Sequence, residues 1–452
     1  MHKLFNDKEF FSSMFKISTP IVIQTLVSSS LNVVDTLMIG QLGSTAIASV
    51  GLANQVFFLL SLLLNGISGG AAIFTSQFFG KKDTKNIKIV FGFCLDICLL
   101  VGVLFSILAI LIPKTILKFY SQDLSVINFG SEYLRIMGFS YIVTSITFPY
   151  SAILRSIRNV KAPLFVSGFA LGLNTFLNYG LIFGNWGLPI MEAKGAAVAT
   201  CISRYVECII LLLYVYISKS LLAVRIKEFF MCNLEILKEY LKTTLPLICN
   251  VVLWSFGITT YNIIYARIGT ESIAAVNIAS TVEGLAFVVF IGISSACNIM
   301  IGNKIGSNEE VLAFNYGKRY IVLGILGAII MGVFLLLGSN TILSFYKVSK
   351  ITYEYAHNIL IIMSCVLGIK VLNIILVQGI LRGGGDTRYT FLQSFIAMWI
   401  FGVPLTYIGA FVCHLPVYFV MLFGISEEIV KLVSGSSRFL SRKWIHNLVE
   451  NI

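Results

Sequence analysis

The chain has 452 residues, of which 57% are hydrophobic and only 12% charged, and its formal net charge is +12. An ordinary soluble domain is about one-quarter charged, so this composition excludes a soluble globular protein, which would lack the polar residues to cover its surface. The positive charge does not indicate nucleic-acid binding, because no polar stretch combines basic residues with interleaved aromatic ones; Lys and Arg also accumulate in the cytoplasmic loops of membrane proteins.

Apolar segments long enough to cross ~30 Å of hydrocarbon as helices recur along the whole chain. The segment before the first of them is charged and amphipathic and has no cleavable signal, so we expect the first span to stay in the mature protein. The last is the least apolar, because Glu427, Glu428 and Lys431 fall near its end. The sequence predicts an all-α integral membrane protein with twelve transmembrane helices, at residues 17–39, 52–78, 89–112, 133–153, 163–184, 195–218, 243–266, 278–302, 320–340, 357–381, 390–410 and 413–433.

The Lys and Arg residues are divided unequally between the two sides of these spans. Of the 33, 24 fall in the N-terminal segment, in alternate loops, at the end of the last span (Lys431) and in the C-terminal tail, and 6 fall in the other loops. The remaining three, Arg135, Arg204 and Lys370, lie within spans. Because positive charge marks cytoplasmic loops, we expect a multi-pass protein of the cytoplasmic (inner) membrane with both termini in the cytoplasm.

The second half of the sequence repeats the first. Pro20 and Pro246 are 226 residues apart, half the length of the chain, and other matches occur at this offset or with a slip of one residue. These matches include Gly66-Ile67-Ser68 with Gly292-Ile293-Ser294 and Ile153-Leu154-Arg155 with Ile380-Leu381-Arg382. Because each half holds six spans, both halves enter from the same side, which predicts two six-helix lobes related by a parallel pseudo-twofold axis.

This duplication predicts the domain organisation. We expect an N-lobe at residues 1–218, a cytoplasmic linker at 219–242 and a C-lobe at 243–452. Transporters built from such repeats bind substrate near the middle of the membrane, between the halves, and rocking of the halves alternates access to the site.

Several motifs, in a fixed order across both halves, resemble one known family. They are VVDTLMIGQLGSTAIASVG, AILRSIRNVKAP, LNTFLNYGLIFG and KGAAVATCISRYVE in the first half, and ILRGGGDTRYTF in the second. Together they resemble the multidrug and toxic compound extrusion (MATE) transporters, and in particular the bacterial DinF/NorM-type members. The resemblance implies two lobes around a central cleft and export of organic, often cationic, compounds in exchange for H⁺ or Na⁺.

Asp35 is the principal candidate for ion coupling. It lies near the outer end of the first span, and a carboxylate within a span costs roughly 2.5–3.5 kcal/mol by insertion scales, which indicates a partner, water or a function. The resemblance places the ion-coupling aspartate of the family in the same motif, with Asn174, Asn178 and Thr200 beside it, where a proton or a transient Na⁺ would bind. Some members have Asp at the position of Asn178, which weakens the Na⁺ assignment. The alternatives are a solvated Asp at a helix end and interhelical packing by the two amides.

Three residues are candidates for a substrate cavity in the second half. Glu283 has Phe57 as its counterpart at the repeat offset, so this charge is specific to the second half. Asn250 stands in the seventh span, where some relatives carry Glu. Lys370 has no acidic residue nearby in the sequence. A solvated helix-end carboxylate remains the alternative for Glu283.

Other polar features of the spans and turns have structural interpretations. Arg204 and Glu207 are three residues apart on one helix and are predicted to pair. Pro20 and Pro246 are predicted to kink spans one and seven, because proline removes a backbone donor and clashes with the preceding turn. The GGGD run at 383–386 lacks the ending of a phosphate-binding loop and is predicted to be a turn.

The leading functional hypothesis is therefore an ion-coupled exporter of small amphipathic, cationic compounds. The alternative is a flippase for lipid-linked intermediates, which the basic residues Arg204 and Lys370 would favour. An enzyme is not expected, because the four His residues are scattered and no nucleotide site is visible; the nine Cys form no CxxC or Cys/His cluster. We expect no resident metal, no cofactor other than the coupling ion, no nucleic acid and no obligate protein partner, with the lipid bilayer as the surroundings.

Overall fold

The computed structural model describes residues 7–224, 233–346 and 348–450. Residues 225–232, in the middle of the predicted linker 219–242, lie outside this range. The described residues are predominantly helical, and each of the twelve predicted spans falls on a long helix or on a run of consecutive helical segments.

In the first half of the chain the helices are α2 (Lys8–Gly40), α3 (Ser44–Lys81), α4 (Thr84–Leu111), α5 (Pro113–Lys118), α6 (Leu124–Ser156), α7 (Lys161–Phe183), η1 (Asn185–Gly187) and α8 (Glu192–Ile217). In the second half they are α10 (Leu234–Ile268), α11 (Thr270–Gly306), α12 (Glu310–Ser344), α13 (Lys350–Asn373), η2 (Ile374–Leu381), α14 (Thr387–Phe395), η3 (Ile396–Gly402), α15 (Val403–Tyr407), η4 (Ile408–Val412) and α16 (Val417–Leu440). Except in the last span, each observed helix begins before the predicted apolar segment, because its backbone hydrogen bonds continue beyond the hydrocarbon region.

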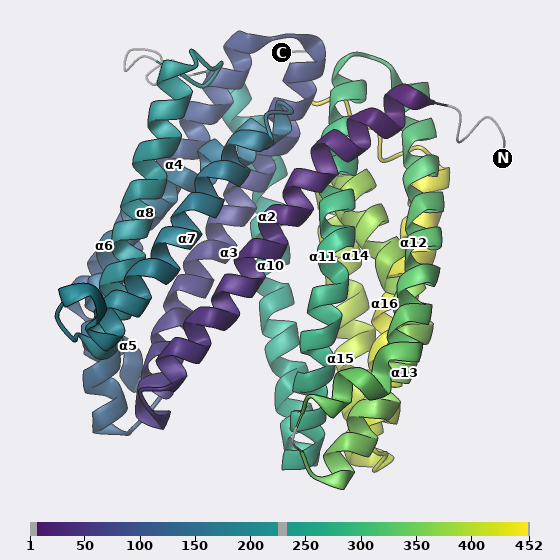
Figure 1. Cartoon of the computed structure of the whole chain (residues 1–452). Coiled ribbons are helices and arrows are strands. Elements are labelled where there is room, and N and C mark those ends of the chain that lie inside the picture. The colour runs from purple at the N-terminus through teal and green to yellow at the C-terminus, as the bar shows by residue number, and fades with distance from the viewer. Residues whose placement is uncertain (1–6, 225–232, 347, 451–452) are drawn as a thin grey trace. The chain divides into compact units, whose positions relative to one another are not determined.

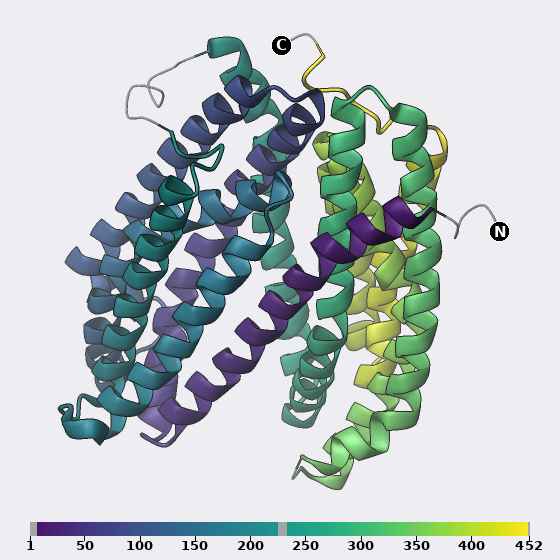
Figure 2. The ribbon, with the colours of Figure 1, turned by 45° about the horizontal axis from the view of Figure 1, so that its top comes forward.

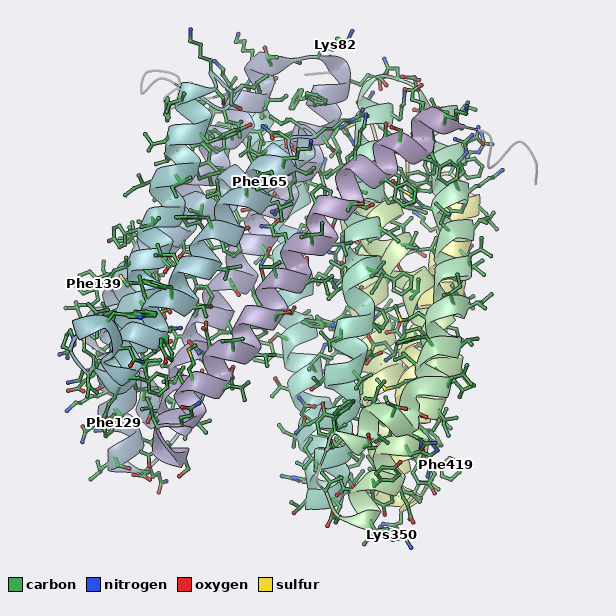
Figure 3. The ribbon with its side chains drawn as sticks, in the orientation of Figure 1. Lys82, Phe129, Phe139, Phe165, Lys350 and Phe419 are labelled. Atoms are coloured by element: carbon green, nitrogen blue, oxygen red, sulfur yellow. The ribbon has the colours of Figure 1, made fainter. Side chains whose placement is uncertain are left out.

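Eleven spans of the described chain are long and apolar enough to cross a membrane. The twelfth predicted span lies in α16, where Glu427, Glu428 and Lys431 add three charges. Large apolar side chains are exposed on the outer sides of the helices, as expected for surfaces that face lipid rather than water. Phe139 and Phe165, for example, are 51% and 71% exposed (Figure 3).

The described chain divides into two compact units. The first-half unit comprises residues 23–224 and 233–244, and the second-half unit comprises residues 7–22 and 245–450. The boundaries therefore differ from the predicted 1–218 and 243–452, because α2 and α10 each contribute residues to both units. Within each unit the helices run alongside one another (Figures 1 and 2).

The two units repeat the same pattern of helix packing. In the first-half unit α3 packs on α4 and α6, α6 packs on α4 and α8, and α7 packs on α8. In the second-half unit α11 packs on α12, α13 and η2, α12 packs on α13, α13 packs on α16, and η3 packs on α16. Equivalent pairs are thus in contact in each unit, as a duplicated six-helix arrangement requires.

The first turns of α2 are anchored in the second-half unit. The ring of Phe10 is fully buried and packs edge-on against Tyr316 and Tyr320 at centroid distances of 4.8 and 5.2 Å. Asp7, just before α2, accepts a hydrogen bond of 2.5 Å from Arg319 Nη1. These contacts tie the start of the chain to α12.

The first turns of α10 are anchored in the first-half unit in the equivalent way. The buried Tyr240 hydroxyl donates to the carbonyl oxygen of Ile67 at 3.0 Å. Pro20 and Pro246 each lie two residues from the point where α2 or α10 passes between units, inside helices that are continuous. That either proline acts as a bending point remains a prediction.

Spans ten and eleven contain wide π-helical turns that hydrophobicity does not reveal. They are η2, η3 and η4. Pro404 follows η3 and has no N–H to offer the carbonyl four residues earlier, so a wider turn is favoured there. The twelfth span starts at Val417 and not at residue 413, because Pro416 precedes the first helical residue in an extended conformation.

Candidate functional site

Asp35 of α2 lies beside the amide side chains of α7. Asn178 Nδ2 donates to Asp35 Oδ1 at 2.8 Å. Asn174 and Asn178 share one face of α7 because residues four apart in a helix lie one above the other. Both amides are buried, with 6% and 1% exposure. The structure thus brings together the aspartate and the two amides that the family resemblance placed beside it.

Asn174 completes the environment of the carboxylate. With its amide nitrogen turned toward α2, it donates to Asp35 Oδ2 at 2.9 Å, and its oxygen accepts from the backbone N and the Oγ1 of Thr200 at 3.2 and 3.1 Å. We adopt this orientation because an ionised carboxylate only accepts hydrogen bonds. Thr200 of α8 therefore orients Asn174 and lies one contact away from Asp35.

Close approach of α8 to α7 makes this contact possible. A Cβ atom on Gly195 would lie 2.6 Å from the backbone oxygen of Leu181, a distance that only glycine tolerates. Thr200 lies five residues further along α8, where it reaches Asn174. A small residue at this crossing therefore positions a polar contact of the site.

One acceptor beside Asp35 has no partner. Asn178 Oδ1 is buried and makes no hydrogen bond within the described structure. A buried acceptor without a donor costs roughly 1–3 kcal/mol, so its retention requires an explanation. Next to a carboxylate, such an oxygen can accept from a protonated carboxyl group or contribute to the binding of a small cation.

These groups open onto a cavity of about 390 Å³ within the first-half unit. Apolar and aromatic side chains form much of its wall, including Phe57 and Tyr133. The Tyr133 hydroxyl donates to Asn54 Oδ1 at 3.5 Å. Its polar and charged lining residues are Asp35, Thr36, Asn54, Tyr133, Asn174, Asn178, Thr200, Ser203, Arg204 and Glu207.

The predicted pairing of Arg204 with Glu207 is confirmed. Arg204 Nη1 lies 2.9 Å from Glu207 Oε2, and its guanidinium lies over the ring of Phe57 at 5.7 Å from the centroid. The sequence did not reveal that this pair lines the same cavity as Asp35. Polar residues that recur on one face of an apolar span are the signal that could have indicated it.

In the second-half unit Glu283 of α11 and Lys370 of α13 form an ion pair. The side chains are 22% and 23% exposed. No acidic residue stands near Lys370 in the sequence, because its partner comes from another helix, 87 residues away. The structure thus joins two of the three candidates for the second cavity, and their role in substrate binding stays a prediction.

The third candidate, Asn250 of α10, has other partners. Its Oδ1 accepts from Arg382 Nη2 at 2.8 Å, and its Nδ2 approaches the carbonyl oxygen of Thr390 at 3.5 Å. Asn250 is 7% exposed. It therefore links span seven to the beginning of the turn between spans ten and eleven and to α14.

The sequence did not reveal a polar network on α16. There the charges of Glu427, Glu428 and Lys431 indicated only that the last span is the least apolar. Glu427 accepts from the Tyr261 hydroxyl at 2.8 Å and pairs with Lys431. Glu428 accepts from Asn373 Nδ2 at 2.7 Å and lies 3.7 Å from Lys431. The partners come from α10 and α13, so spacing along the chain could not predict them.

Among the residues with described positions, no group of three or more His, Cys, Asp or Glu side chains is arranged to hold a metal ion. The oxygen atoms around Asp35 belong mainly to amides and hydroxyls.

Comparison with known proteins places these features among transporters. The family model described as MatE matches residues 20–180 and again residues 246–408, once in each half. The "Probable multidrug resistance protein NorM" of Thermotoga maritima is 26% identical over 446 residues, which cover 96% of this chain and 93% of that protein. The "Multidrug resistance protein NorM" of Burkholderia vietnamiensis is 25% identical over 410 residues, covering 88% of this chain and 86% of that protein.

The fold is also similar to solved structures. A MOP superfamily transporter from Pyrococcus furiosus superimposes with a TM-score of 0.85 at 18% identity, covering 95% of this chain and 96% of that one. The predicted class of fold, an all-α membrane protein of two six-helix lobes, is confirmed.

Proposed function

The chain belongs to the MATE family of multidrug efflux transporters, and from this premise we propose that it exports small amphipathic, cationic organic compounds in exchange for H⁺ or Na⁺ by alternating access. The MatE match in each half and the shared pattern of packing support an alternating-access mechanism, which in duplicated transporters exposes the site to each side in turn. We also propose the orientation that the Lys and Arg count predicts, with both termini in the cytoplasm. The test is a C-terminal fusion to a fluorescent protein that fluoresces only in the cytoplasm; this orientation predicts that the fusion is fluorescent.

The observation that carries the proposal is the Asp35 carboxylate, bound by two buried amides at the wall of a cavity. A volume of about 390 Å³ is within the range of pockets for small molecules, and its apolar walls suit an amphipathic compound. Asp35 supplies the negative charge that a cationic compound and a coupling ion would share. Cargo and ion then compete for one carboxylate, and this competition is the basis of exchange.

The arrangement of donors favours H⁺ as the coupling ion. Each oxygen of Asp35 already accepts an N–H, from Asn178 or from Asn174, which leaves fewer lone pairs for Na⁺. A proton on Asp35 requires an acceptor, and the unpaired Asn178 Oδ1 becomes one when its amide rotates. The ionised and protonated carboxyl groups would therefore be stabilised by two orientations of the same amide.

Transport into proteoliposomes under separately imposed pH and Na⁺ gradients tests the proposal. We expect the pH gradient to drive accumulation of ethidium, and Asp35→Asn to reduce this to background because the variant cannot exchange a proton. Asp96→Asn is the matched control, because Asp96 is an exposed carboxylate of another span that does not line the cavity. Wild-type transport by Asp35→Asn would remove Asp35 from the mechanism, and driving by Na⁺ alone would reverse the choice of ion.

The flippase alternative rested on the basic residues Arg204 and Lys370. Arg204 is paired with Glu207 and Lys370 with Glu283, and the lining of the first-half cavity carries a net negative charge when Asp35 is ionised, which disfavours an anionic lipid head group. The geometry therefore favours the exporter.

A further inference from the structure

The first-half cavity contains a positive charge of its own. Arg204 is 29% exposed, whereas its partner Glu207 is 10% exposed, so the guanidinium is the more accessible member of the pair. The guanidinium also lies over Phe57, an aromatic ring that could otherwise attract the cation of a cargo molecule. The protein thus places its own cation where a cationic cargo would be expected to bind.

The charge of the cavity can be counted. Of the described residues that line it, Asp35 and Glu207 carry negative charges and Arg204 carries a positive charge. With Asp35 ionised, the cavity therefore has one net negative charge. Without Arg204 it would have two.

The repeat supports the proximity of positions 35 and 204. Asp35 corresponds to Tyr261 at the offset of 226, and Arg204 corresponds to Lys431 with the slip of one residue. In the second-half unit these two counterparts share a partner, because Glu427 accepts from Tyr261 and pairs with Lys431. Equivalent positions in the first half are therefore expected to interact across the cavity.

The ion pair that Arg204 forms in the first half is more exposed than the ion pair that its counterpart Lys431 forms in the second half. The Lys431 side chain is 12% exposed and Glu427 is 7% exposed, so the second-half pair is largely enclosed by protein. Arg204 has more than twice the exposure of Lys431. The difference suggests that the charge on Arg204 acts on what enters the cavity, in addition to joining two turns of α8.

We propose that Arg204 makes the first-half cavity selective for organic cations of single positive charge over those of double charge. This inference rests on the function proposed above. A monovalent cation neutralises the one net negative charge, whereas the second charge of a divalent cation meets the guanidinium at close range. In the low effective dielectric of a protein interior, that repulsion is large enough to make the divalent cation bind more weakly than the monovalent one.

Two dyes with the same phenanthridinium ring provide the test. Ethidium carries one positive charge and propidium two, and the binding of each to the purified full-length protein in detergent is measured by fluorescence anisotropy at pH 8. We expect the wild-type protein to bind ethidium more tightly. In Arg204→Gln the affinity for propidium relative to ethidium should rise roughly ten-fold or more, the effect of one unit charge a few ångströms away.

Variants that neutralise Glu207 separate an effect of Arg204 on selectivity from a structural role of Arg204. Glu207→Gln leaves no net charge, so ethidium affinity should fall by a similar factor, and the double variant Arg204→Gln/Glu207→Gln should restore the wild-type ratio. Lys242→Gln is the matched control, because Lys242 forms an exposed pair with Glu239 at the same spacing, outside the cavity. It should leave the ratio unchanged.

The outcomes distinguish the inference from the proposed function. An unchanged ratio in Arg204→Gln would overturn the inference while leaving cation export intact. If Arg204→Gln does not fold, unchanged ethidium affinity in Glu207→Gln would also overturn it. Failure of the wild-type protein to bind either dye, together with no driven transport, would overturn both.

Discussion

Asp386 is a buried carboxylate in the turn that follows η2, outside the membrane-spanning helices. Its Oδ2 accepts from Arg438 Nε at 2.7 Å, and its Oδ1 lies 3.7 Å from His446 Nε2. Burial raises the pKa of Asp386, but the nearby imidazole of His446 and the hydrogen bond and charge of Arg438 outweigh it and hold the pKa below its ordinary value. A carboxyl group with a lowered pKa stabilises the folded state above its unfolded pKa, near 4, and this contribution is lost as the pH falls through the folded pKa.

We therefore expect Asp386→Asn to lower the thermal unfolding temperature at pH 7. Removing one partner of a buried pair costs about 3–5 kcal/mol. Arg438 is 22% exposed, so we expect about 2–4 kcal/mol here. The difference between variant and wild type should persist down to pH 4 and shrink as the pH is lowered further, through the lowered pKa of the folded state, because the wild-type carboxyl then becomes protonated as well. Tryptophan fluorescence during heating in detergent measures both effects.

The matched control for this prediction is Glu132→Gln. Glu132 and Lys194 form a surface pair with both side chains about half exposed, and such pairs contribute at most about 1 kcal/mol. If Asp386→Asn destabilises the protein no more than Glu132→Gln does, the carboxylate of Asp386 is not a structural anchor.

How far the sequence could predict the site depends on where the partners lie along the chain. Asn174 and Asn178 are one helical turn apart, so their shared face could be derived, and the family motif supplied their link to Asp35. The pair Glu283–Lys370 joins helices far apart in sequence, which spacing cannot show.

At the scale of an element, the C-terminal tail after α16 packs on the turn between spans ten and eleven. Trp444 is fully buried, and its indole N–H donates to the carbonyl oxygen of Phe439 at 3.1 Å. The backbone N–H of His446 donates to the carbonyl oxygen of Gly384 at 2.9 Å. The sequence predicted the GGGD run as a turn, but its role as the surface that receives the tail required the structure.

Gly384→Ala should release this tail. A Cβ atom at this position would lie 2.3 Å from Trp444 Cε3 and 2.5 Å from its backbone oxygen, so either the indole or the turn must move. We expect trypsin to cleave faster after Lys443, which precedes the buried indole, as measured by mass spectrometry of the detergent-solubilised protein.

Gly172→Ala is the control for this change. No atom lies within 4 Å of the position of its Cβ, and alanine favours a helix over glycine, so its cleavage rate should match the wild type. Equal rates in Gly384→Ala and Gly172→Ala would mean that the tail is held by contacts other than Trp444.

The helices themselves were the part of the fold best predicted from sequence. Lipid as solvent forces long apolar runs, so all twelve spans could be located, while their ends, which depend on capping and turns, were less well placed. The π-helical turns around Pro404 and the start of α16 at Val417 were not predictable, because they depend on local backbone geometry that hydrophobicity does not report.

At the scale of the whole molecule, each compact unit includes helical turns from the start of the other repeat. The second-half unit includes residues 7–22, and the first-half unit includes residues 233–244. A duplication read from sequence alone places each boundary in the linker, because the repeat begins at equivalent points of α2 and α10. It cannot show that the first turns of each repeat pack in the other unit.

This exchange makes a specific prediction for the chain divided in the linker, as fragments 1–224 and 225–452. Fragment 225–452 lacks the helical turns that bury Phe10 against Tyr316 and Tyr320 and the carboxylate that pairs with Arg319. Expressed alone, it should accumulate in the membrane at several-fold lower amounts than when it is expressed with fragment 1–224, because a loss of even 1–2 kcal/mol changes abundance that much. Quantitative immunoblotting of membranes measures the difference.

A shorter partner identifies which residues are responsible. Fragment 1–43 supplies α2 without the rest of the first-half unit, and its first turns contain the side chains that pack on α12. If α2 is what the second-half unit lacks, fragment 1–43 should raise the amount of fragment 225–452, and the same fragment with Phe10→Ala should raise it less. Accumulation of fragment 225–452 to full amounts without any partner would show that each half folds independently and that the exchanged turns of α2 add nothing to its stability.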